Sequence, residues 1–142
     1  MLEKQISVSD NMNDINNTSQ KLFFGSNTFH EKLETECIWD IEKYWKLEII
    51  LIDIIKNTHN NKTIAKNLAG NLYYLSSYIS KSVQSTLCEN DHWNIENLSI
   101  DDILYYHDRF NILINILWKN HNYQEYNYFF RENPIYATSN PP

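Results

Sequence analysis

Three long stretches of this chain space apolar residues three, four and seven positions apart, the pattern of one face of an α-helix. They begin near residue 30 or 35, near residue 61 and at residue 99, and they end near residues 57, 87 and 118. The turns of all-β proteins are rich in Gly and Pro, but this chain has only 2 Gly and 3 Pro in 142 residues. The pattern therefore predicts an all-α protein. The three faces consist of Ile38, Ile41, Trp45, Ile52 and Ile55; of Ile64, Leu68, Leu72, Leu75, Ile79 and Val83; and of Ile103, Tyr106, Phe110, Leu113, Ile114 and Leu117.

Capping residues and turn signals set the expected boundaries. Asn61 or Thr63 can cap the second helix, and Ser99 opens the third, with Asp102 three positions later as in a capping box. Residues 123–130 predict a short helix that Asn133 and Pro134 end. We expect a mobile tail and a short docking segment over residues 1–26, a helical domain over 27–134 and a C-terminal tail over 135–142. The predicted architecture is a single-domain antiparallel bundle of three main helices with one or two short ones.

The net negative charge of the chain is concentrated in one stretch of the sequence, residues 88–108. Residues 88–108 contain six carboxylates and no Lys or Arg, which leaves twelve of the 18 acidic residues to balance the 12 basic ones elsewhere. A balanced body with one acidic stretch is typical of a surface that binds a basic partner. The same balance argues against nucleic-acid binding, which needs a basic face. The six are Glu89, Asp91, Glu96, Asp101, Asp102 and Asp108.

Targeting and redox signals are weak. The N-terminus is polar and unlike a signal peptide, and the longest apolar run is too short to cross a membrane. Cys37 and Cys88 form no CxxC motif and no disulfide framework. We therefore expect a soluble, cytoplasmic protein with free thiols and no cofactor.

Two polar residues fall on apolar helix faces and are candidates for chemistry. Glu48 lies at the centre of the first face, and His107 lies within or near the edge of the third. Each could be catalytic or bind a metal, but a buried polar residue held by hydrogen bonds is the commoner outcome, and we interpret both as a structural polar core. We expect the partner of Glu48 to come from another helix, with His107 or a Tyr favoured. No complete metal-ligand set, phosphate-binding loop or nucleophile motif accompanies them, so no enzymatic activity is expected.

Trp93 is the aromatic residue that stands apart from the helical faces. It lies in the acidic stretch, between Asp91 and Glu96. An aromatic side chain surrounded by charge on a loop is typical of an interface anchor, although it could equally plug the end of the bundle.

From about residue 29 to residue 134 the chain resembles the small, acidic, mostly helical immunity proteins of contact-dependent growth inhibition and other polymorphic toxin systems. The resemblance lies in Phe29, in Tyr44-Trp45-x-Leu47-Glu48, in Asn90-Asp91 and Asn97-Leu98, and in Asn133-Pro134. It implies a bacterial protein without enzymatic activity that binds a toxin domain and blocks its active site or an essential surface.

The sequence thus predicts an immunity protein whose partner is a cognate toxin domain, with a basic nuclease as the favoured class. Toxin binding is assigned to six residues of the acidic stretch, Glu89, Asp91, Trp93, Glu96, Asp101 and Asp102. Two alternatives stay open: a small helical enzyme with Glu48 and His107 in a polar pocket, and an acidic adaptor for another protein.

Overall fold

The computed structural model describes residues 19–142, and every regular element within that range is a helix. The long helices are α3 (Ile41–Thr58), α4 (Lys66–Leu87) and α5 (Ile100–Trp118). Shorter ones are α2 (Phe29–Glu36), the 3-10 turn η2 (Tyr123–Tyr126), α6 (Asn127–Arg131) and α7 (Pro134–Ser139). The all-α class and the three long helices predicted from the sequence are confirmed. Residues 1–18, most of the expected tail, lie outside the described residues.

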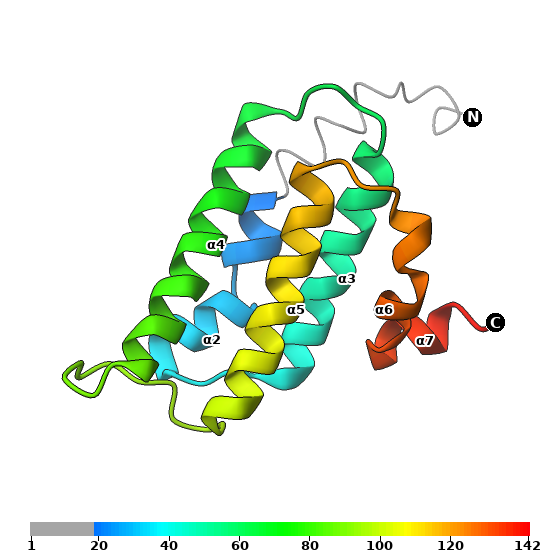
Figure 1. Cartoon of the computed structure of the whole chain (residues 1–142). Coiled ribbons are helices and arrows are strands. Elements are labelled where there is room, and N and C mark those ends of the chain that lie inside the picture. Colours follow the sequence, from blue (N-terminus) through cyan, green and yellow to red (C-terminus); the bar gives the residue numbers. More distant parts are fainter. Residues whose placement is uncertain (1–18) are drawn as a thin grey trace.

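The long helices form an up–down–up bundle in which α5 packs against both α3 and α4 (Figure 1). Successive long helices run in opposite directions, as short connections between neighbouring helices require. The loop between α4 and α5 lies at the end of the bundle where α5 begins (Figure 1). Most of the core comes from the predicted faces, and its fully buried members include Leu51, Ile52, Leu68, Leu72, Leu75, Ile79, Ile103, Phe110 and Leu113. Ile41, predicted on the first face, is instead 37% exposed, at the first position of α3.

The first predicted helix is divided in two, which corrects the expectation of one continuous helix to residue 57. Cys37 ends α2 in the left-handed region, with φ of 55°. Asp40 then caps α3 by accepting a hydrogen bond from the backbone N–H of Lys43 at 3.0 Å. Between them Trp39 is completely buried. The break between α2 and α3 therefore places the large aromatic side chain of Trp39 in the core.

Two further boundaries differ from the sequence prediction. The helix α4 begins at Lys66 after Ala65, without the side-chain cap expected from Asn61 or Thr63. The predicted short helix over residues 123–130 is present as η2 and α6 and ends at Arg131, before Asn133. Asn133 and Pro134 also open a further helix, α7, because the Asn133 side chain accepts hydrogen bonds from the N–H groups of Ile135 and Tyr136. Pro at the first helical position loses no hydrogen bond. Residues 135–139, expected in a frayed tail, are thus helical, with Tyr136 buried.

The described part of the N-terminal segment docks as predicted. Residues 19–24 are helical, and Phe23 is buried in the core. Phe24 packs beside it, with the two ring centroids 6.0 Å apart. Gly25 ends this helix by donating its backbone N–H to Lys21 O at 3.0 Å.

Candidate functional site

The acidic loop between α4 and α5 is tied to the body at three consecutive residues. Ile95 is buried, and its backbone N–H donates to Thr86 Oγ1 at 2.9 Å. The N–H of Glu96 donates to Cys37 O at 3.0 Å. The Asn97 side chain accepts from Trp39 N at 2.8 Å and donates to Trp39 O at 2.9 Å. The loop is therefore held in one conformation by the same α2–α3 junction that interrupts the first predicted helix.

All six carboxylates of the acidic stretch are solvent-exposed. Within residues 19–142, none of them forms an ion pair with Lys or Arg. Hydrogen bonds from the backbone N–H of Trp93 and from the Ser85 hydroxyl hold the pKa of Asp91 below its usual value, so this carboxyl is ionised at neutral pH. Asp101 and Asp102 occupy the first turn of α5, where the helix dipole favours negative charge. Ser99 caps that turn as predicted, accepting from Asp102 N at 3.2 Å.

Exposed apolar side chains lie among these carboxylates at the start of α5. Ile100 is 51% exposed, Tyr105 47% and Leu104 37%. Tyr105 contacts the ring of Tyr106 edge-on, with the ring centroids 5.1 Å apart. Tyr106 in turn packs against Trp45, at a centroid distance of 5.4 Å, so the exposed ring has a fixed aromatic base. We call the six carboxylates together with Ile100, Leu104 and Tyr105 the acidic end.

The apolar members of the acidic end were not predicted from the sequence, although a signal was present. At 100° per residue, Leu104 and Tyr105 turn away from the buried face that Ile103 and Phe110 define. Apolar residues on the outer face of a helix beside Asp101 and Asp108 have the composition of an interface centre with a charged rim.

Trp93 is less exposed than an isolated interface anchor would be. It is partly buried and packs against the hydrophobic core. The structure therefore gives Trp93 a role in closing the end of the bundle, and a contact between Trp93 and a partner stays a prediction.

Glu48 lies in a buried cluster of charged and polar groups. It is completely buried, and Arg109 of α5 binds both of its carboxylate oxygens, Nε to Oε2 and Nη2 to Oε1, each at 2.9 Å. Arg109 also donates to Glu132 Oε2 at 2.9 Å and to Phe129 O at 3.2 Å. Its guanidinium lies 4.0 Å from the centroid of the Phe129 ring. The partner of Glu48 on another helix is thus Arg109 rather than His107 or a Tyr, the two favoured candidates.

Asn133 completes this cluster and joins it to the C-terminal helices. Its side-chain N–H group donates to Trp45 O at 2.9 Å and to Glu48 Oε1 at 3.3 Å. Burial alone would lower the pKa of Arg109, but the hydrogen bonds and charge of Glu48 outweigh it and raise that pKa. Burial and the nearby Glu48 charge raise the pKa of Tyr44 well above its usual value. The cluster is thus a satisfied ion pair that fastens α6 and α7 to α3 and α5.

His107 is half-buried and lies apart from Glu48. Its Nε2 is 3.3 Å from Ser80 Oγ and 3.4 Å from Asn111 Nδ2. Burial lowers the pKa of His107, and the charge of Asp108 opposes this. The polar pocket shared by Glu48 and His107, on which the enzyme alternative depends, is therefore not formed.

Within residues 19–142, no three His, Cys, Asp or Glu side chains are grouped as metal ligands. In the same range, no helix is long and apolar enough to cross a membrane.

Comparison with protein-family models, with curated proteins and with solved structures finds no match to this chain.

Proposed function

We propose that this chain is an immunity protein that binds a basic toxin domain through the acidic end and so blocks the toxin. The observation that carries the proposal is the combination found there: six exposed carboxylates without a Lys or Arg partner in the part of the chain that the structure describes, next to exposed apolar side chains on a fixed aromatic base. Protein interfaces combine a desolvated apolar centre with a charged rim in this way.

The two kinds of side chain would act at different stages of binding. Exposed carboxylates attract a basic surface over about one Debye length, roughly 8 Å at physiological ionic strength, and so accelerate association. Tyr105 and its apolar neighbours would lose water only in the final complex and so slow dissociation. A nuclease has a basic cleft for its substrate, and the acidic end would occupy that cleft by presenting negative charge.

The anchoring of the loop supports a binding role. Asn97 holds Trp39, and Ile95 is inserted into the core, so the loop carboxylates need little ordering when a partner arrives. A surface that is already ordered loses less conformational entropy on binding.

The direct test is co-expression of the chain with the toxin domain encoded next to its gene. We expect wild-type protein to restore growth, and a charge-reversed Glu96→Lys/Asp101→Lys variant to protect less. A matched control, Asp53→Lys/Glu125→Lys, makes the same change in net charge at exposed positions outside the acidic end. Equal loss of protection in both variants, or a neighbouring gene whose product is not toxic, would reject the proposal.

A further inference from the structure

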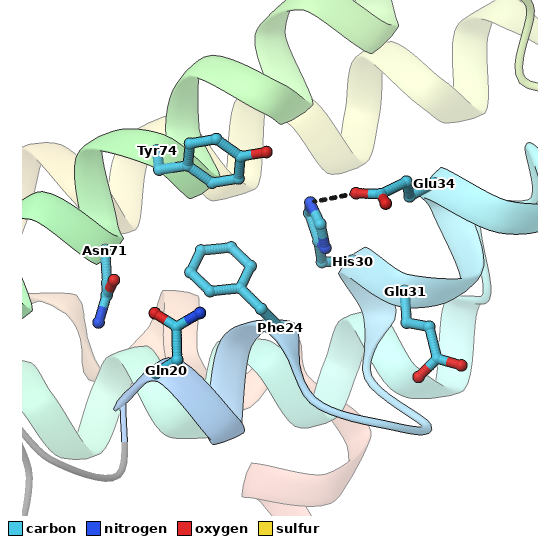
Figure 2. Close-up of a pocket in the computed structure, with 7 residues that line it drawn as sticks. All are labelled: Gln20, Phe24, His30, Glu31, Glu34, Asn71 and Tyr74. Atoms are coloured by element: carbon cyan, nitrogen blue, oxygen red, sulfur yellow. Dashed lines mark ion pairs between the residues drawn. The ribbon is translucent and has the colours of Figure 1, made fainter.

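A second surface feature lies where α2, α4 and residues 19–24 meet. It is an open cavity of about 490 Å³ lined by seven residues, Gln20, Phe24, His30, Glu31, Glu34, Asn71 and Tyr74 (Figure 2). In the view of Figure 1, α2 and residues 19–24 are drawn between α4 and α5. None of the seven lining residues belongs to the acidic end, so the cavity is a separate feature.

Aromatic rings form the floor and one wall of the cavity. The Phe24 ring centroid lies 4.8 Å from that of His30 and 5.2 Å from that of Tyr74. On its other side His30 packs against Tyr78 at 4.5 Å. The faces of Phe and Tyr rings carry partial negative charge and attract cations.

His30 is buried, 6% exposed, yet its Nε2 has no aligned hydrogen-bond partner. This nitrogen lies 3.3 Å from Glu34 Oε2 (Figure 2). Burial lowers the pKa of His30, against the opposing charge of Glu34, so the imidazole is neutral at neutral pH. In the neutral tautomer that carries its proton on Nδ1, His30 Nε2 and the Glu34 carboxylate are two acceptors facing one position that lacks a donor.

The cavity lining holds carboxylates but no Lys or Arg. The Glu31 side chain accepts a hydrogen bond from Asn27 N at 2.7 Å and points away from the rings in Figure 2. Glu34 is the carboxylate that faces His30, and its side chain is 52% exposed. One carboxylate and one imidazole are fewer than the three protein ligands of a typical catalytic zinc site, whereas aromatic faces suit an organic cation.

We propose that this cavity binds an organic cation that carries a guanidinium or ammonium group. The N–H donors of the cation bond to His30 Nε2 and to the Glu34 carboxylate, and its charged face lies against Phe24 and Tyr74. The cation is either a free small molecule or the Arg or Lys side chain of another protein, and both present the same group.

The test is an NMR titration of the ¹⁵N-labelled full chain with ethylguanidinium, compared with neutral ethylurea at equal ionic strength. We expect saturable shifts from ethylguanidinium at residues 20–34 and 71–78, and none from ethylurea. Glu34→Gln removes a charge-assisted hydrogen bond and should weaken binding roughly tenfold or more. Glu42→Gln, at an exposed carboxylate of α3, should leave binding unchanged. Tyr74→Leu, at an exposed position, tests the aromatic wall without opening the core and should also weaken binding.

A blocked Gly-Arg-Gly peptide identifies the source of the cation. Binding equal to that of ethylguanidinium indicates a protein side chain, and exclusion of the peptide indicates a free small molecule. The proposal is overturned if ethylurea causes the same shifts, if Glu34→Gln binds ethylguanidinium like wild type, or if the shifts fall outside the cavity.

Discussion

Carboxylates occur in two contrasting settings in this molecule. Glu48 is buried, and Arg109 and Asn133 satisfy its oxygens. The carboxylates of the acidic end are exposed and have no basic partner within the described residues. The contrast indicates that the first setting maintains the fold, whereas the second is available to another molecule.

The contrast predicts that the largest stability effect comes from the buried pair. Arg109→Met should lower the free energy of unfolding by about 3–5 kcal/mol, because Glu48 is left charged and unpaired in the core. The measurement is urea denaturation followed by circular dichroism. The double variant Glu48→Met/Arg109→Met removes both charges and should lose less than the sum of the two single variants. Equal stability of Arg109→Met and wild type would contradict the role assigned to the cluster.

Removal of the hydrogen bonds between Asn97 and the Trp39 backbone, which anchor the acidic loop, should give the next largest loss of stability. Asn97→Ala removes both hydrogen bonds to the Trp39 backbone and should cost about 1–3 kcal/mol. Hydrogen exchange should show faster exchange in residues 88–99, while the Glu48 cluster keeps its protection. If exchange in the loop is unchanged, the loop is held by Ile95 and Glu96 without help from Asn97.

Tyr105 tests the apolar part of the acidic end. Tyr105→Ala should speed dissociation of the toxin complex by roughly ten- to thirtyfold, about 1–2 kcal/mol, with little change in stability because the ring is exposed. Tyr73→Ala, at the more exposed Tyr73 of α4, is the matched control and should have no effect on binding. Surface plasmon resonance with the toxin domain provides both rates. Identical dissociation of the two variants would remove Tyr105 from the interface.

A smaller loss of stability should appear when the pH is lowered. Burial lowers the pKa of both His30 and His107 in the folded chain, so the unfolded chain binds protons first as the pH falls. The contribution of these two histidines to the free energy of unfolding is therefore fully present above the pKa of an unfolded histidine, about 6.5, and declines as the pH falls below that value. The urea midpoint at pH 5.5 should lie below that at pH 7.5, and His107→Gln should reduce the difference. A midpoint that is higher at pH 5.5 would contradict the direction of both pKa shifts.

Helical periodicity predicted the class, the long helices and much of the core, because burial of an apolar face dominates helix packing. It also placed Glu48 in the interior. It did not identify Arg109 as the partner of Glu48. A helical wheel shows on which face of its own helix a residue lies, but not which residue of another helix lies opposite it. Trp39 and Asn97 are 58 positions apart in sequence, so their pairing and the break between α2 and α3 left no local signal.

In the proposed function, the acidic end attracts a basic partner. The most direct measurement is the association rate with the toxin domain at two salt concentrations, for wild type, Glu96→Lys/Asp101→Lys and the control Asp53→Lys/Glu125→Lys. We predict that salt slows wild-type association strongly and dissociation much less, and that only the first variant associates slowly at low salt. Equal association rates for the two variants would show that the carboxylates of the acidic end are a solvated surface with no part in binding.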